Sequence, residues 1–339
     1  MKNLILAILV FSVSGFLFAG NNSNVSQTGY ENEAVVEQVG NGHQATVDQF
    51  GKNLAEVSQT GGDDNTATVT QGTAAAHVSN NRKPNYNGDH EWGAWIEQVG
   101  SSNTAEINMQ GSRGSADIYQ EGGSNEAYQE INTYASGATS NTRKGLDIDQ
   151  VGSNNVANQK TVASFGSYGI KKMHVDQVGS GNQADQLSIG GMASVMQVRQ
   201  DGSNNDYTVD VSATGKASPL DLPFAHKPAG DYIQYQNGRF STATIDIVGS
   251  GNHTAQYQEY TIWSASGHNY ADMDIAGDSN NAAQGQLGEF NHSTIDIVGC
   301  SNVAAISQQG SGTAEWDGNT ASISQTGSNN VSSIEQTMP

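Results

Sequence analysis

The sequence predicts an all-β protein, a β-solenoid whose two-strand rungs of about 22 residues stack as parallel, in-register strands. Three observations predict this fold. A short unit recurs roughly every eleven residues in the first part of the chain, polar and apolar residues alternate within each unit, and each unit ends in a glycine–asparagine turn. Loop insertions are expected along one edge of the solenoid.

The first residues are expected to be a signal peptide, residues 1–19. Lys2 precedes an apolar run from Leu4 to Phe18 that ends in small residues, so cleavage is predicted after Ala19. No other stretch of the sequence is apolar and long enough to span a bilayer, and we expect no transmembrane segment in the mature chain. This predicts a secreted protein.

The composition excludes several classes of protein. The formal net charge is -20, which argues against a nucleic-acid partner because phosphate binding requires clustered Lys and Arg. Hydrophobic residues make up 35% of the chain, less than the roughly 45–50% of ordinary globular domains. A chain with so few hydrophobic residues forms only a small core, and it needs polar side chains and neighbouring strands to complete its backbone hydrogen bonds. Cys300 is the single cysteine, so there is no disulfide framework, and it is either a free thiol or an intermolecular link.

The repeats form two blocks, residues 20–79 and 93–339, separated by an interruption at 80–92. In each unit a glutamine is followed two residues later by glycine, and an asparagine and often an alanine come next. The amides that we expect to form ladders are Gln27, Asn32, Gln38, Gln49, Gln59, Gln71, Gln98, Asn103, Gln150, Asn155, Gln177, Asn182, Gln200, Asn205, Asn252, Asn280, Asn302, Gln325 and Asn330. Isoleucine takes the glutamine position at 247, 275 and 297.

Glycine suits the turn after each strand because it adopts positive φ without steric cost. The expected turn glycines are Gly29, Gly40, Gly51, Gly61, Gly100, Gly152, Gly179, Gly202, Gly249, Gly277, Gly299 and Gly327.

Stacking explains why the amides recur. Successive strands of a parallel sheet lie ~4.8 Å apart, so equal positions come to lie above one another and each amide can bond its own copy in the next rung. One strand-and-turn unit cannot be stable alone, since ordering eleven residues costs ~11–22 kcal/mol while burying one Val or Ile returns ~1.5–3 kcal/mol. The end rungs therefore offer unpaired strands to another copy.

Insertions interrupt the later units near 132–144, 163–172, 213–230, 261–269 and 310–318. Pro84, Pro219, Pro223 and Pro228 lie in such interruptions and Pro339 ends the chain, so no proline deletes a strand hydrogen bond. Trp92, Trp263, Trp316, Tyr168 and Phe224 also lie there. Two interpretations stay open: these aromatic residues form a binding edge, or the loops pack on themselves.

The unit Q-x-G-x-x-N-x-A-x-x-x-Q, carried by Gln27, Gly29, Asn32, Ala34 and Gln38, resembles the curlin repeat of bacterial curli fibres. The resemblance implies an extracellular functional amyloid of the biofilm matrix, exported through an outer-membrane pore and polymerised at the cell surface. It also implies self-association into fibres and a possible second curlin-type subunit as partner. The interval of the first block is closer to that of the minor, nucleating subunit.

No catalytic or metal-binding constellation is found. His43, His253 and His292 lie at or beside repeat turns, and 61–65, "GGDDN", lacks the spacing of a calcium loop. We expect no enzyme activity, cofactor or metal. Rows of Asp and Glu on the outer face either bind divalent cations weakly or are a solvated surface that limits lateral association.

The sequence therefore favours a structural subunit of extracellular amyloid fibres that polymerises through its end rungs, in biofilm matrix and surface adhesion. The alternative is a monomeric β-solenoid adhesin that binds glycan or surface through its loop edge.

Overall fold

The computed structural model describes residues 10–12, 20–29, 32–72, 79–81, 93–110, 115–132, 145–162, 171–189, 194–205, 234–237, 241–259, 268–310 and 318–337. Their regular structure consists of β-strands, which confirms the all-β prediction. Among these residues no helix is long and apolar enough to cross a bilayer. Most of the signal peptide, the five prolines, the insertions apart from their margins, and the five aromatic residues assigned to them lie outside the described residues.

The chain divides into two compact units, residues 1–172 and 173–339. The strands of the first unit are β1 (Val10–Ser12), β2 (Asn22–Gly29), β3 (Glu33–Asn41), β4 (Gln44–Asp63), β5 (Thr66–Gln71), β6 (Ser79–Asn81), β7 (Gly93–Ser101), β8 (Thr104–Met109), β9 (Ser115–Gly123), β10 (Glu126–Asn132), β11 (Gly145–Ser153) and β12 (Val156–Val162).

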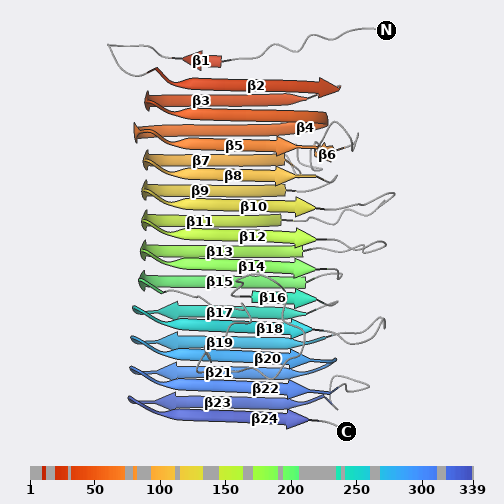
Figure 1. Ribbon diagram of the computed structural model, residues 1–339, viewed down its shortest axis with the longest axis vertical. Helices are drawn as coiled ribbons and strands as arrows, with labels where there is room; N and C mark the ends of the chain where they lie inside the picture. The colour runs from red at the N-terminus through yellow and green to blue at the C-terminus, as the bar shows by residue number, and fades with distance from the viewer. Residues whose placement is uncertain are drawn as a thin grey trace, which may run out of the picture. The chain divides into compact units, whose positions relative to one another are not determined.

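These strands form two parallel stacks (Figure 1). The β3 stack runs β3, β4, β7, β9, β11, and the β2 stack runs β2, β4, β5, β8, β10, β12. β4 is long enough to contribute its first part to the β2 stack and its second part to the β3 stack. From β7 on, each strand pairs with the strand two places along the chain, so the chain climbs one strand spacing for every two strands, as a solenoid does.

The second unit holds β13 (Lys171–Ser180), which begins just before its boundary, β14 (Gln183–Ile189), β15 (Ser194–Ser203), β16 (Gln234–Asn237), β17 (Thr242–Val248), β18 (His253–Glu259), β19 (Tyr270–Ala276), β20 (Asn281–Leu287), β21 (His292–Val298), β22 (Val303–Gln309), β23 (Thr320–Thr326) and β24 (Val331–Thr337). Odd-numbered strands form the β13 stack and even-numbered strands form the β14 stack. Pairing is again parallel and in register, for example Ile245 beside Met273 and Met273 beside Ile295.

The core of each unit is a narrow column between its two stacks. Val47, Val57, Val69 and Ile107 are fully buried in the first unit, and Ile297 and Ile306 in the second. The glutamines and asparagines that frame these apolar residues are buried as well, and most of them have no exposed surface. Because an unpaired buried amide is costly, the hydrogen bonds of these side chains decide whether the fold is stable.

Candidate functional site: amide ladders and end strands

A continuous glutamine ladder runs through the β3 stack. The side-chain Nε2 of each glutamine donates to Oε1 of the glutamine in the next strand: Gln38 to Gln59, Gln59 to Gln98, Gln98 to Gln120, and Gln120 to Gln150, at 2.8–2.9 Å. In-register pairing places these residues side by side, and all the amides point the same way along the stack. The ladder therefore has a polarity, with an acceptor at its beginning and a donor at its end.

The same amides also join the two stacks. The second Nε2 hydrogen of Gln98 is donated to the backbone oxygen of Thr66 at 3.0 Å, and that of Gln120 to the oxygen of Thr104 at 3.1 Å. Gln49, in the β2 stack, donates in the opposite direction to the oxygen of Glu33 at 3.0 Å. Each glutamine thus bonds along the stack and across the interior, which no aliphatic side chain could do.

The β2 stack carries a shorter ladder. Gln27 donates to Gln49 and Gln49 to Gln71, both at 2.9 Å, and Gln71 then meets the sulfur of Met109 at 3.6 Å. Two strands further on, the amide shifts to the central inward position, where Gln129 donates to Gln159 at 3.1 Å. The Oε1 of Gln129 is buried without a hydrogen-bond partner, because the residue before it in the column is Ile107.

In the second unit, Gln177 donates to Gln200 at 2.8 Å, and the column then continues through Ile247, Ile275 and Ile297. Gln325 follows Ile297, and its buried Oε1 has no partner. The last four strands of the β14 stack hold a ladder, in which Gln258 donates to Gln286, Gln286 to Gln308, and Gln308 to Gln336, at 2.8–3.0 Å. These four residues were not predicted as ladder members from the sequence. A signal for them was available, since each lies two residues after an inward Gln or Ile, namely Gln256, Gln284, Ile306 and Ile334.

The asparagines form a second kind of ladder at the start of each strand. The Oδ1 of Asn280 accepts both the backbone N–H and the side-chain Nδ2 of Asn302, at 3.0 and 3.1 Å, and Asn302 does the same for Asn330. The Nδ2 of Asn280 and that of Asn302 also donate to a glycine carbonyl of the following turn, at 2.9 Å to Gly299 and to Gly327. Asn182, Asn205 and Asn252 continue this column, and Asn103 and Asn155 belong to its counterpart in the first unit.

His43 occupies an asparagine position in the first unit. Its ring Nδ1 accepts the backbone N–H of Asn65 at 3.2 Å, and its ring Nε2 lies 3.3 Å from the oxygen of Val39. The imidazole therefore supplies an acceptor where the repeat otherwise has a carboxamide oxygen. The backbone N–H of His43 donates to Asn21 Oδ1, as the backbone N–H of an asparagine does elsewhere in the column. His43 is fully buried and contributes to the turn.

All twelve turn glycines singled out in the sequence have positive φ. Between Gly100 and Gly122, and again between Gly122 and Gly152, the stacked turns approach so closely that a Cβ on the first glycine would lie 1.9–2.0 Å from the carbonyl oxygen of the second. Gly29 and Gly51 approach in a similar way. Both the conformation and the close stacking thus require glycine.

Stacking of equal positions also brings acidic side chains together on the outer face. Asp117 lies next to Asp147 in register, at a hollow of about 220 Å³ that Trp95, Glu97 and Tyr119 also line. Burial first, and then the carboxylates of Asp147 and Asp149, together raise the pKa of Asp117 to about 7. Like charges one strand apart are therefore a cost of this fold.

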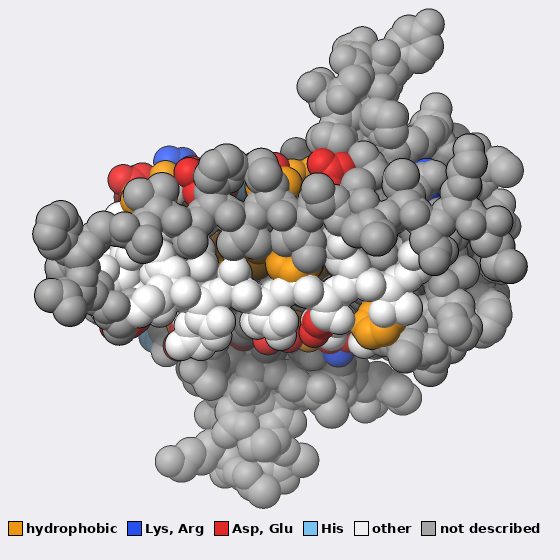
Figure 2. Space-filling view, turned by 90° about the horizontal axis from the view of Figure 1, so that it is seen from above, with side chains coloured by type: hydrophobic (Ala, Val, Ile, Leu, Met, Phe, Trp, Pro, Cys, Tyr) orange, Lys and Arg blue, Asp and Glu red, His pale blue; other side chains and the backbone are white. Residues whose placement is uncertain are grey.

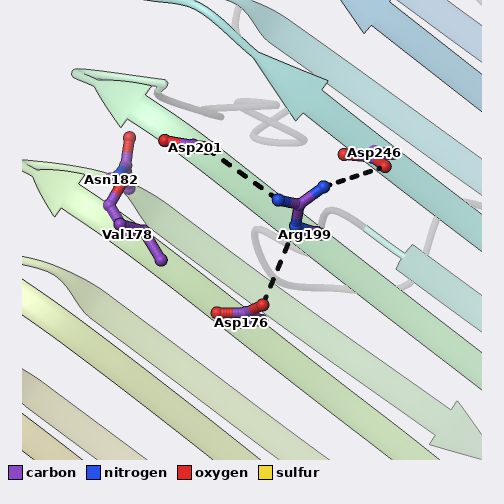
Figure 3. Close-up of polar contacts among 6 residues, drawn as sticks. All are labelled: Asp176, Val178, Asn182, Arg199, Asp201 and Asp246. Atoms are coloured by element: carbon purple, nitrogen blue, oxygen red, sulfur yellow. Dashed lines mark hydrogen bonds and ion pairs between the residues drawn. The ribbon is translucent and has the colours of Figure 1, made fainter.

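One arginine relieves this repulsion in the second unit. Arg199 lies between carboxylates on three strands and contacts Asp176 at 3.8 Å, Asp201 at 3.9 Å and Asp246 at 3.5 Å (Figure 3). Further along the same column, Asp274 has a pKa raised by burial and then by the carboxylates of Asp272, Asp246 and Asp296. Arg199 is 45% exposed, so each ion pair contributes little by itself.

The last two strands leave their outer edges open. Among the described residues, β23 pairs only with β21 and β24 only with β22. The inward residues of β24, Ser332, Ile334 and Gln336, are half-buried, whereas Ile306 and Gln308 one strand earlier have no exposed surface. In Figure 2, which looks down on the β2 side of Figure 1, the described surface is a band of uncharged polar atoms with some hydrophobic side chains and acidic residues along its borders.

Comparison with known families agrees with the resemblance noted in the sequence. The family model of the curlin-associated repeat matches residues 20–51, which span β2, β3 and the first part of β4. A search of curated proteins found no match. The matched segment holds Gln27, Gln38 and Gln49, the first members of the two glutamine ladders. The chain therefore carries a curlin-associated repeat at residues 20–51, within a β-solenoid-like array of parallel strands.

Proposed function

We propose that this protein is a structural subunit of extracellular, curli-like amyloid fibres, which polymerises through its end strands in the biofilm matrix and contributes to surface adhesion. Such a subunit is secreted, is not an enzyme and has other copies of itself as its main partners. The resemblance to curlin adds an outer-membrane secretion pore and a second curlin-type subunit as further proposed partners.

The observation that carries the proposal is the open edge of β23 and β24. Because the amide ladders repeat from strand to strand, strands of another copy could continue them at this edge. Parallel, in-register strands with stacked amides are the arrangement found in cross-β fibres. Soluble proteins usually protect sheet edges with charges, proline or bulges. β23 carries no charged residue and β24 carries one, Glu335.

Fibre diffraction of the assembled chain tests the proposal. We expect a chain beginning at Gly20 to form fibres with a meridional reflection near ~4.7 Å. A chain that remains monomeric at high concentration and still binds a surface would contradict the proposal and favour the adhesin alternative. Deleting 213–230 or 261–269 would then abolish attachment.

A further inference from the structure

The first and last rungs of the chain carry similar residues at their inward positions and in their turns. β2 and the residue before it carry Asn, Ser, Val, Gln and Gly where β23 and its flanking residues carry Asn, Ala, Ile, Gln and Gly, and β3 resembles β24 in a similar way. The aligned residues are Asn21 with Asn319, Ser23 with Ala321, Val25 with Ile323, Gln27 with Gln325, and Gly29 with Gly327, followed by Asn32 with Asn330, Ala34 with Ser332, Val36 with Ile334, and Gln38 with Gln336.

The climb of the chain allows one way of joining the two rungs. Successive strands alternate between the two stacks, and each lies half a strand spacing above the one before it. A strand added after β24 would therefore pair with β23. A second copy therefore continues the array when its β2 lies on β23 and its β3 lies on β24. If β2 lay on β24 instead, β3 would lie two spacings from β23 and could not pair with it.

The hydrogen-bonding groups at the two rungs are complementary in this arrangement. Every glutamine-to-glutamine bond described above is donated from one strand to the next along the chain, so Gln336 Nε2 ends one ladder as a donor, while Gln38 Oε1 begins another and accepts no bond among the described residues. Within the chain each asparagine Oδ1 accepts from the next strand, and Asn330 Oδ1 is the acceptor that ends its column. Asn32 of a second copy brings the backbone N–H and Nδ2 that this acceptor requires.

The outward side chains are nearly neutral at this junction. β2 offers Asn22, Asn24, Ser26 and Thr28, and β23 offers Thr320, Ser322, Ser324 and Thr326. On the other pair of strands, Glu37 would lie beside Glu335. Inside the chain each of these glutamates is next to a serine, Ser58 and Ser307 respectively. The junction therefore creates one pair of like charges that the separate chain does not have.

We infer that a second copy of this chain adds head to tail in a single register, with its β2 on β23 and its β3 on β24, and that the Glu37–Glu335 pair makes this addition sensitive to charge. This inference rests on the proposed fibre function. The strand β1 pairs with β3 along the edge that the junction uses, so the junction applies to a chain that has lost residues 1–19.

Disulfide trapping tests the register. In a Cys300→Ser background, a tagged Ser26→Cys chain beginning at Gly20 is mixed with an untagged Ser324→Cys chain, assembled, oxidised and dissolved without reductant. Neighbouring strands ~4.8 Å apart are within the Cα range of a disulfide. The control pairs Asn24→Cys with Ser333→Cys, since Ser333 is also exposed but lies on β24, where it would face Asn24 if β2 lay on that strand.

We expect the Ser26→Cys and Ser324→Cys chains to form mixed dimers in at least tenfold higher yield than the control, and Asn24→Cys with Ser322→Cys to behave alike. Fibres in which the control pair crosslinks as well or better would overturn the register and leave the fibre function standing. Absence of fibres from all mixtures and from the Cys300→Ser parent would overturn both.

Discussion

The polarity of the glutamine ladder leads to a sharp prediction about the cost of interrupting it. Replacing Gln120 by isoleucine leaves the donor of Gln98 and the acceptor of Gln150 without their ladder partners. Replacing Gln98 alone does the same to Gln59 and Gln120. Replacing both still strands only two groups, the Gln59 donor and the Gln150 acceptor, because the two isoleucines lie next to each other. Ile247, Ile275 and Ile297 show that isoleucine fits this column in the second unit.

The magnitude follows from the number of stranded groups. A buried group without a partner costs about 1–3 kcal/mol, so each single variant loses about 2–6 kcal/mol in the ladder. Each buried isoleucine returns about 1.5–3 kcal/mol. The backbone oxygens of Thr66 and Thr104 also lose amide donors, but these losses occur in the single and double variants alike and cancel in the cycle. The two single losses together should exceed the loss in the double variant by about 2–6 kcal/mol.

Urea denaturation of the unassembled chain measures this coupling for wild type, Gln98→Ile, Gln120→Ile and the double variant. We expect the double variant to be at least as stable as either single variant, with unchanged dependence on urea concentration. Glu97→Ala, on the exposed face of the same strand, serves as a control and should have little effect. Single losses that simply add in the double variant would refute the view that the ladder acts as a chain of donors and acceptors.

Three further predictions concern the turns, the acidic face and the junction. Gly122→Ala should destabilise the chain by more than about 1–3 kcal/mol, because φ is +111° and the new Cβ would meet the oxygen of Gly152 at 1.9 Å, whereas Gly145→Ala, which has open space around it, should have little effect in the same denaturation assay. Asp117 binds a proton between pH ~4 and ~7 in the folded state but not when unfolded, so its contribution to stability falls as pH rises through this range, by up to about 1.4 kcal/mol per unit. Asp117→Asn should remove this part of the dependence of stability on pH, with the neighbouring carboxylates Glu56, Glu97, Asp147 and Asp149 left in place. An unchanged dependence on pH would contradict the assignment to Asp117. Glu335→Gln should strengthen the addition of a second copy about fourfold at low salt, since two charges ~4.8 Å apart in water repel by about 0.9 kcal/mol. The critical concentration for fibre formation measures this change. Glu33→Gln, which would face Val331, should leave that concentration unchanged.

The sequence by itself determined the strand-and-turn unit and the parallel, in-register stacking. Alternation in "NEAVVEQ" placed Val36 and Gln38 inside, and the glycines after each glutamine marked turns that all have positive φ. These features are local, or they repeat at a constant interval. In a stacked array a repeat also sets its own register, since equal positions pair.

Only the tertiary structure decided which amides meet. Gln71 is next to Met109 and not Gln98, because consecutive units alternate between two stacks and an insertion separates them. It also showed that Gln129 and Gln159 hold the central inward position, that Gln258, Gln286, Gln308 and Gln336 form a ladder, and that the second hydrogen of ladder glutamines such as Gln98 crosses the interior to a carbonyl. These hydrogen bonds depend on distances between strands that are far apart in the chain. Because the insertions differ in length, the spacing of residues along the sequence does not give those distances.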